Sequence, residues 1–268
     1  MVGTEQLEKL IAITLFTGHI VHENPVSLIL IATPESGKTE LMKKFAGNKG
    51  VEYLNDVTAY GIMRRYKEDI EMGRVRHFMF PDLCTPLARD PHTVATLIAF
   101  LNGLVEEGIT AIETYAQPNI RLKLGQHQAV GIITGITARE MKERKRVFGK
   151  VGFLSRMLPV SYTYANSTRL KILESIAARQ YQQDGTVKLE LPRNPWKVHL
   201  PIDYARRITS IAVAKTDDGL FGFRKQKQLQ TLMMGSALSE EREEVQQKDF
   251  DLVVELSDFI GVEKEMVI

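Results

Sequence analysis

The stretch from Ser27 to Leu41, SLILIATPESGKTEL, decides what kind of fold this chain can adopt. It opens with an apolar run typical of a buried strand, passes through a turn-rich octapeptide ending in Gly37-Lys38-Thr39, and continues into a helix-compatible segment. Strand, loop and helix in this order are what a phosphate-binding loop requires, with a chance turn as the alternative. The pattern predicts a nucleotide site whose residues are Ala32, Thr33, Pro34, Glu35, Ser36, Gly37, Lys38, Thr39 and Glu40.

The chemistry of this loop suggests ATP and Mg²⁺ as its ligands. Backbone N–H groups would hold the phosphates, and Lys38 would neutralise the β and γ phosphates. Thr39 would offer its hydroxyl to Mg²⁺. Ala32 stands where the usual pattern has Gly, so the loop keeps a small side chain but loses some backbone freedom. The Glu35 carboxylate is expected to point to solvent or to a partner subunit.

The composition bounds the class of protein. A chain of 268 residues with 44% hydrophobic and 25% charged residues can bury a full core, which excludes the disordered and fibrous classes. The net charge of +2 says nothing about nucleic acid. The single Cys84 indicates a reducing compartment. No apolar stretch approaches a membrane span, and Glu5 and Glu8 do not suit a signal peptide. We expect a soluble, cytoplasmic protein without membrane contact.

Strand-like and helix-like segments alternate through the first part of the chain. Helices are expected at 4–22, 56–70 and 91–107, strands at 51–54, 77–80, 129–134 and 157–164, and a hairpin around Gln117-Pro118-Asn119. This alternation predicts an α/β fold whose mainly parallel sheet is sandwiched by helices. Beyond residue 165 the pattern is mainly helical, at 167–181, 201–216, 224–239 and 247–260, with one strand at 187–191. The expected domains are therefore 1–165 and 166–268.

Hydrolysis needs further residues besides the loop. Asp82, after the strand 77–80, is the candidate to hold the Mg²⁺ shell, with a helix or turn cap as the alternative role. Leu83 follows where phosphate-loop hydrolases usually carry a Glu as base, and lack of a base could slow hydrolysis by about 10² to 10⁴. Glu113 in the hairpin could substitute. Thr134, expected at the end of its strand, could orient water at the γ-phosphate, or could simply satisfy backbone groups.

The order of these parts resembles the AAA+ P-loop ATPases, and within them the minichromosome-maintenance (MCM) helicase-like group. ATPESGKT resembles Walker A, FMFPD resembles Walker B, and LVEEGI with the hairpin ITAIETYAQPNIRLKLG resembles the segment before sensor 1. GIITGIT takes the place of sensor 1, with Thr134 where that family commonly has Asn. GFLSRMLPVSY is similar to the string that carries the arginine finger, here Arg156. FRKQKQLQTLMMGSALSEER resembles the lid helix with sensor 2, either Arg224 or Lys227.

This resemblance implies a nucleotide-binding core at 1–165, a helical lid domain at 166–268, and a homo-oligomeric ring, a hexamer in the family. The Arg156 guanidinium would stabilise charge on a neighbour's transferring phosphoryl group; a surface salt bridge is its alternative role. The implied function is ATP hydrolysis coupled to helicase or translocase action on DNA, in replication with a partner protein or in a phage or mobile-element context. Two alternatives remain: an ATP-gated loader or DNA-binding switch with little or no hydrolysis, and a protein-remodelling chaperone.

Contacts to nucleic acid have two candidate sources. The segment from Arg139 to Lys150 carries six basic and two acidic residues, which could bind phosphates or form a solvated helix surface. Arg121 and Lys123 lie in the hairpin, which in the resembling helicases points into the ring channel. Only Tyr115 is available nearby for base stacking. Because the chain begins almost at the expected ATPase core, no N-terminal DNA-binding tier is expected.

Overall fold

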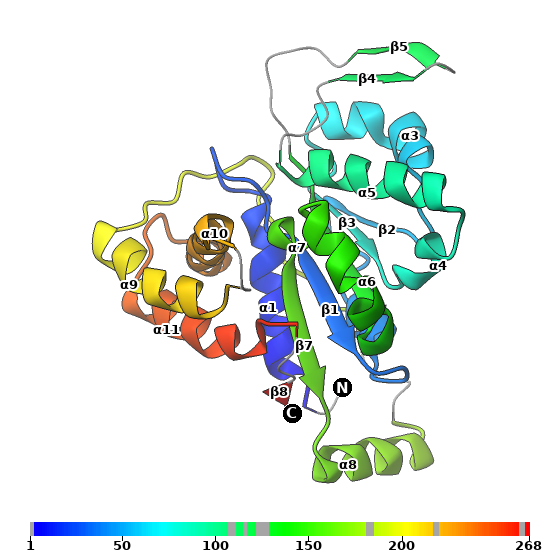
Figure 1. Cartoon of the computed structure of the whole chain (residues 1–268). Helices are drawn as coiled ribbons and strands as arrows, with labels where there is room; N and C mark the ends of the chain where they lie inside the picture. Colours follow the sequence, from blue (N-terminus) through cyan, green and yellow to red (C-terminus); the bar gives the residue numbers. More distant parts are fainter. Residues whose placement is uncertain are drawn as a thin grey trace.

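The computed structural model describes residues 3–106, 111–114, 117–121, 129–180, 185–216, 220–262 and 266–268. Its centre is a sheet of six strands, all parallel, with helices on both faces (Figure 1). The strand order is β2-β3-β6-β1-β7-β8. The strands are β1 Leu28–Ala32, β2 Val51–Tyr53, β3 His77–Phe80, β6 Gly131–Thr137, β7 Leu158–Thr163 and β8 Met266–Val267. The α/β prediction is therefore confirmed at the level of a helix-flanked parallel sheet.

Strand β1 lies in the interior of the sheet, between β6 and β7, and is buried at all five positions. Side chains alternate between the two faces of a strand, so both faces must be covered to bury such a run. Leu28, Leu30 and Ala32 belong to one hydrophobic cluster, and Ile29 and Ile31 belong to the other. This explains why the sequence of β1 is apolar without interruption.

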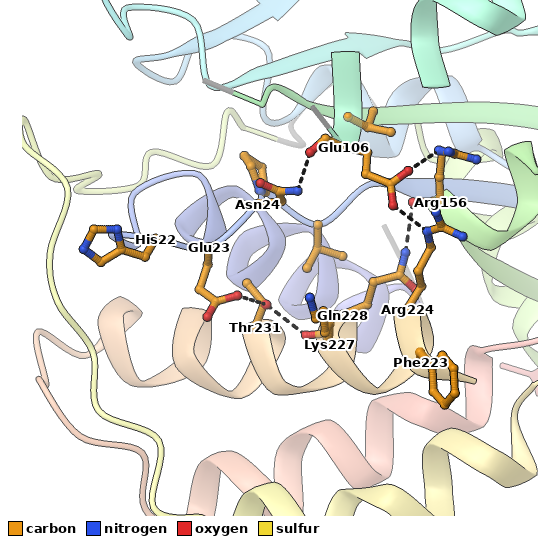
Figure 2. Close-up of a pocket in the computed structure, with 13 residues that line it drawn as sticks. His22, Glu23, Asn24, Glu106, Arg156, Phe223, Arg224, Lys227, Gln228 and Thr231 are labelled. Atoms are coloured by element: carbon orange, nitrogen blue, oxygen red, sulfur yellow. Dashed lines mark hydrogen bonds and ion pairs between the residues drawn. The ribbon is translucent and has the colours of Figure 1, made fainter. Parts of the chain in front are cut away.

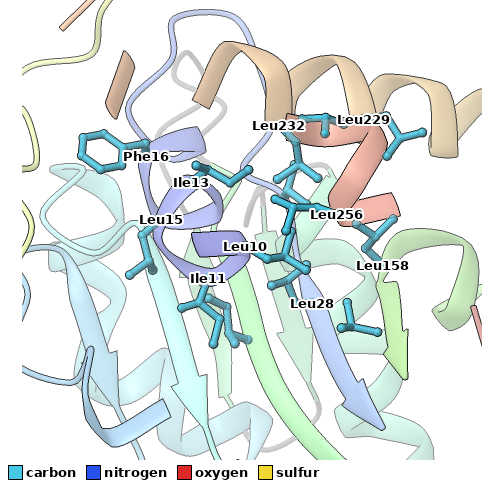
Figure 3. Close-up of a cluster of buried hydrophobic side chains, with 14 of the residues drawn as sticks. Leu10, Ile11, Ile13, Leu15, Phe16, Leu28, Leu158, Leu229, Leu232 and Leu256 are labelled. Atoms are coloured by element: carbon cyan, nitrogen blue, oxygen red, sulfur yellow. The ribbon is translucent and has the colours of Figure 1, made fainter. Parts of the chain in front are cut away.

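One face of the sheet is covered largely by helices from the two ends of the chain. They are α1 Glu5–Thr17, α2 Lys38–Lys43, α9 Ile202–Ala214, α10 Phe223–Ser239 and α11 Gln247–Leu256, followed by the short 3-10 helix η2 Ser257–Phe259. Helix α10 packs closely on α1 (Figure 3). A Cβ at Gly235 would lie 2.5 Å from the Ile13 carbonyl oxygen, so only glycine permits this approach.

The hydrophobic cluster on this face crosses the expected domain boundary at residue 165. Leu10 of α1, Leu28 of β1 and Leu232 of α10 belong to the same set of buried side chains (Figure 3). The C-terminal helices therefore share a core with the sheet. Their assignment to a separate lid domain at 166–268 stays a prediction.

The opposite face is covered by helices from the middle of the chain. They are α3 Ala59–Glu71, α4 Cys84–Leu87, α5 Pro91–Glu106, α6 Ala138–Lys150 and α7 Phe153–Arg156. The Thr58 and Thr137 hydroxyls accept hydrogen bonds from the first-turn N–H groups of α3 and α6, which fixes where these helices begin. In the described part of the chain, no helix has the length and apolar character needed to cross a membrane.

Two segments extend away from this layered body. The antiparallel hairpin of β4 Ala111–Thr114 and β5 Gln117–Arg121 follows α5 in the chain, and helix α8 Asn166–Ala177 follows β7 (Figure 1). They lie at opposite ends of the molecule in that view. None of the residues of α8 is buried.

Several predicted elements differ from the structure, among them two boundaries and one strand. Strand β6 is Gly131–Thr137 rather than 129–134. The hairpin pairs Thr114 with Gln117, so Gln117-Pro118-Asn119 lie in β5 instead of forming the turn. Residues 187–191 form no strand. This segment is instead held by Asn48, whose side chain contacts the Val187 carbonyl and the Leu189 N–H at 2.8 and 2.7 Å.

Candidate nucleotide site and a cluster of arginines

The loop between β1 and α2 has the backbone conformation of a tight turn into a helix. Gly37 immediately precedes α2 with a φ of 76°, in the left-handed region that favours glycine. Glu35 also has a positive φ, 61°, which is uncommon for a non-glycine residue. Glu35 and Thr39 are both exposed, which agrees with the expectation that the Glu35 carboxylate faces solvent or a partner subunit.

The Lys38 ammonium folds back onto the loop. It donates to the carbonyl oxygens of Ala32 and Thr33 at 3.0 and 2.9 Å, and to Ser36 Oγ at 3.0 Å. Among the described residues no carboxylate forms an ion pair with it. Burial lowers the pKa of Lys38, and the nearby Cys84 and Asp82 oppose this shift. A partly buried cation held only by neutral oxygens fits a phosphate as its charged partner.

Two tyrosines at the end of β7 support the loop from one side. The Tyr162 and Tyr164 hydroxyls both donate to the Ser36 carbonyl oxygen, at 3.1 and 2.8 Å. Burial raises the pKa of both hydroxyls, so they remain protonated donors. The sequence prediction missed this pair. The two tyrosines are two residues apart in the sequence, and this spacing could have indicated that both lie on one face of β7, the strand next to β1.

Asp82 lies two residues after the end of β3, and its carboxylate accepts hydrogen bonds at the start of α4. Its Oδ1 accepts from the Cys84 N–H at 2.9 Å, and its Oδ2 accepts from Thr85 Oγ1 at 3.0 Å. The capping alternative is therefore realised in the structure, and the Asp82 carboxylate also opposes the lowering of the Lys38 pKa. No group of three or more His, Cys, Asp or Glu in the described residues could hold a metal ion. Mg²⁺ takes one or two protein ligands together with phosphate oxygens and water, so the hydroxyl of Thr39 and the carboxylate of Asp82 are of the right chemical type, and their role as its ligands stays a prediction.

Leu83 stands at the position where phosphate-loop hydrolases usually carry a Glu as base, and its side chain is fully buried. It belongs to the hydrophobic cluster on the α5 face, and its N–H donates to the Gly135 carbonyl oxygen at 2.7 Å. This position therefore contributes packing rather than proton transfer. The side chain of Glu113, the proposed substitute base, lies outside the described residues.

The predicted place of Thr134 at a strand end is wrong. Strand β6 continues to Thr137, so Thr134 lies about 10 Å short of its carboxyl end. Its register partner is Ile29, on the face that packs against α5 rather than α2, and its buried Oγ1 has no hydrogen-bond partner in the described structure. Thr137 lies at the strand end and caps α6. The T-x-x-E pattern with Glu140 signalled that end.

A second cluster of charges lies at the other end of the sheet. Glu106, the last residue of α5, is shared by two arginines: its Oε2 is 2.6 Å from Arg156 Nε, and its Oε1 is 2.6 Å from Arg224 Nε (Figure 2). Burial raises the pKa of Glu106, but the hydrogen bond from Arg224 and the charge of Arg156 outweigh it and hold the pKa below its usual value. Sequence reasoning did not find Glu106 as a partner of these arginines.

These charges border a pocket of about 640 Å³. Gln228 donates to the Arg156 carbonyl oxygen at 2.9 Å, and Asn24 donates to the Glu106 carbonyl oxygen at 2.7 Å (Figure 2). The lining residues are His22, Glu23, Asn24, Pro25, Val26, Val105, Glu106, Arg156, Phe223, Arg224, Lys227, Gln228 and Thr231.

The pocket lies at the amino end of the strands. Val26 precedes β1 and Arg156 precedes the parallel strand β7, whereas the phosphate loop follows the carboxyl end of β1. The two candidates for sensor 2, Arg224 and Lys227, line this pocket, and their role in a nucleotide site stays a prediction. The structure groups Arg156, Arg224 and Lys227 with each other and away from Lys38.

The basic segment on α6 is partly neutralised within its own helix. Arg144 pairs with Glu140 and also donates to the Leu87 carbonyl oxygen, and Arg139 lies 3.0 Å from Glu143. This matches the solvated-helix alternative for those two arginines. The side chains of Arg121, Lys123 and Tyr115, the other residues considered for nucleic acid, lie outside the described residues.

Comparison with known proteins relates this chain to solved structures only. No family model matches it, and no curated protein matches its sequence. A crystal structure of a "putative ATPase" from Cytophaga hutchinsonii ATCC 33406 is similar to it, with a TM-score of 0.53 at 13% sequence identity. The match covers 98% of this chain and 82% of that one. The two proteins share a fold.

Proposed function

We propose that this chain is an ATPase of the AAA+ type that binds ATP and Mg²⁺ at the loop between β1 and α2. The observation that carries the proposal is the Lys38 ammonium, which is partly buried and held by three neutral oxygens of the loop. The fold shared with the Cytophaga protein described as a "putative ATPase" supports it.

In this proposal the residues of the loop divide the binding of the triphosphate among them. Lys38 exchanges its contacts with the Ala32 and Thr33 carbonyls for the β and γ phosphates. Thr39 and Asp82 hold Mg²⁺, which when bound neutralises charge on the phosphates. Tyr162 and Tyr164 keep the Ser36 carbonyl turned away from the phosphates, where its oxygen would repel them.

The arginines of the pocket would act on the nucleotide of a neighbouring copy. Arg156 and Arg224 lie at the end of the sheet opposite to their own loop, so both can meet a triphosphate only across an interface between chains. A head-to-tail contact repeated around a closed ring, which the resemblance suggests is a hexamer, would bring each arginine pair to the next loop. A guanidinium there would stabilise charge on the transferring phosphoryl group.

The rate of ATP hydrolysis distinguishes two functions that this ATPase could have, a motor acting on DNA and an ATP-gated loader or switch. A helicase or translocase acting on DNA, in replication with a partner protein or in a phage or mobile-element context, is supported by the MCM-like order of motifs and by the excess of basic residues on α6. An ATP-gated loader or switch is favoured by buried Leu83, which supplies no base. Steady-state ATPase rates with single-stranded and duplex DNA, across a salt series, distinguish them because only a motor should be stimulated several-fold.

The binding of ATP itself is tested by Lys38→Ala, with Lys43→Ala as the matched control. Lys43 is on the same helix but exposed, and it pairs with Glu40 at 2.7 Å. We expect Lys38→Ala to weaken binding of a fluorescent ATP analogue with Mg²⁺ by about a hundredfold, and Lys43→Ala to change it by less than about threefold. Equal affinity in Lys38→Ala and the wild-type chain would refute the proposed site.

A further inference from the structure

Helix α8 carries a stripe of apolar side chains that the rest of the chain does not cover. Leu170, Leu173 and Ile176 are 62%, 58% and 49% exposed, and none of the residues of the helix is buried. Residues three apart in a helix lie on the same side of it, so these three form one surface. Three large aliphatic side chains gathered in water on one helix indicate a contact surface rather than scattered exposure.

A second apolar surface lies at the start of α10. Phe221 and Phe223 are 83% and 73% exposed, and their rings stack on each other with centroids 5.5 Å apart and planes 14° apart. Phe223 also lines the pocket that contains Arg156 and Arg224 (Figure 2). The aromatic pair therefore belongs to the arginine end of the molecule.

The two surfaces lie at opposite ends of the sheet. Helix α8 begins two residues after Tyr164, whose hydroxyl holds the phosphate loop at the carboxyl end of β1. Phe223 lies one residue before Arg224 at the amino end. Figure 1 shows α8 extending from the end of β7, away from α7 at its start.

With a triphosphate bound as in the proposed function, the charges at the two ends are complementary. The pocket at the arginine end presents Arg156, Arg224 and Lys227 against the carboxylates of Glu23 and Glu106. At the loop end Glu35 is exposed and Glu40 pairs with Lys43, so the negative charge of this end comes mainly from the triphosphate of the proposed function. A two-fold pairing through the arginine ends would place guanidiniums against guanidiniums. Head-to-tail pairing places each arginine end against the next loop end, which charge favours.

We propose that Leu170, Leu173 and Ile176 of one copy pack against Phe221 and Phe223 of the next copy of the same chain. The inference rests on the proposed function, because it assigns the side chains that bring the arginines of one copy to the loop of its neighbour. Burial of the stacked rings and the aliphatic stripe supplies the apolar centre of the contact, and the arginines and the phosphates lie beside it.

The test uses two variants of the full chain, and each variant removes the apolar side chains of one of the two surfaces. The α8 variant is Leu170→Ser with Leu173→Ser, and the α10 variant is Phe221→Ser with Phe223→Ser. Met72→Ser is the control, because Met72 is 64% exposed at the end of α3. Sedimentation velocity is measured with Mg²⁺ and a non-hydrolysable ATP analogue. All the substituted side chains are largely exposed, so thermal melting should be unchanged.

We expect the wild-type chain and the control to assemble, and each variant alone to need at least about a 30-fold higher concentration. An equal mixture of the two variants should form dimers and nothing larger. In this mixture the α10 variant still has its α8 surface, and the α8 variant still has its aromatic pair. These two surfaces can bind each other, and no intact surface remains to add a third copy. This result is specific to a head-to-tail contact between these two surfaces.

Other outcomes overturn the inference. Assembly of either variant alone at wild-type concentration, or a mixture that remains monomeric, excludes this contact. Binding of the ATP analogue is measured on the same samples. A wild-type chain that binds the analogue without assembling refutes the interface alone, whereas a wild-type chain that does not bind it refutes the proposed function.

Discussion

The two ends of the sheet hold their charges in different ways. At the carboxyl end, the Lys38 ammonium contacts three neutral oxygens and no carboxylate among the described residues. At the amino end, Arg156 and Arg224 both contact the Glu106 carboxylate. A phosphate reaching Lys38 replaces neutral hydrogen bonds, whereas a phosphate reaching either arginine must compete with an existing ion pair.

This difference indicates what a single chain can do before it meets a neighbour. The loop end is ready to take a phosphate, because its cation gains a charged partner and loses none. The arginine end is only partly neutralised, because Arg156 and Arg224 share one carboxylate, and an approaching anion must compete with Glu106 for them. Binding at the loop and assembly through the arginines are then separate events, and each can be disturbed alone.

The largest expected effect is acid sensitivity at the amino end. His77 opens β3, and His19 follows α1; both are buried. Burial, with a contribution from nearby Arg76, lowers the pKa of His19 to about 4, and burial and the neighbouring His19 lower that of His77 to about 3. At a pH between these folded-state pKa values and the unfolded-state pKa of 6.5, both histidines are protonated in the unfolded chain but stay neutral in the folded chain. Stability therefore falls as the pH drops below 6.5, by up to about 4 kcal/mol at pH 5.

Urea denaturation at pH 7.5 and pH 5 measures this loss. The double variant His19→Asn and His77→Asn should be less stable than the wild-type chain at pH 7.5 but should lose less on acidification, since its buried amides do not titrate. An equal loss in both proteins would assign the acid sensitivity to other groups.

The sequence predicts the part of the fold that depends on local patterns. The apolar run of β1 and its following Gly-Lys-Thr identify strand, loop and helix because each signal lies within a few residues. The segment 187–191 looked like a strand from its own residues, but Asn48, more than a hundred residues away, takes its backbone groups. The ion pairs of Glu106 with Arg156 and Arg224 likewise join distant segments. These contacts join residues that tertiary packing brings together, so the spacing of residues along the chain does not predict them.

The second prediction removes the shared carboxylate. Glu106→Ala leaves two guanidiniums side by side without their anion, and should lower the free energy of unfolding by about 1 to 3 kcal/mol, since the ion pairs are partly exposed. Glu106→Gln is the matched control, because it keeps an oxygen acceptor and should cost less than Glu106→Ala. The affinity of the loop for the ATP analogue in a monomeric sample should be unchanged in both. A large change there would mean that the two ends are coupled within one chain.

The third prediction concerns the support of the loop. Tyr164→Phe removes one of the two hydroxyls that bind the Ser36 carbonyl, and should lower the free energy of unfolding by about 1 kcal/mol and weaken ATP-analogue binding by about fivefold. Tyr204→Phe, on α9 and away from the loop, should leave affinity unchanged. Isothermal titration calorimetry of both variants with the ATP analogue measures these affinities. If Tyr164→Phe binds as well as the wild-type chain, the hydroxyl supports the fold only.

The smallest effect is expected at Thr134, in the sheet between the two ends. Its buried Oγ1 has no hydrogen-bond partner in the described structure, so Thr134→Val replaces an unsatisfied hydroxyl by a methyl group of similar shape. Stability should stay equal or rise by up to about 1 kcal/mol. Thr137→Val, at the end of the same strand, removes the cap of α6 and should cost about 1 kcal/mol. ATPase assays add a second readout: if Thr134 oriented water at the γ-phosphate, Thr134→Val would lose activity without losing stability. A stable variant with unchanged turnover would place Thr134 in the packing of the sheet alone.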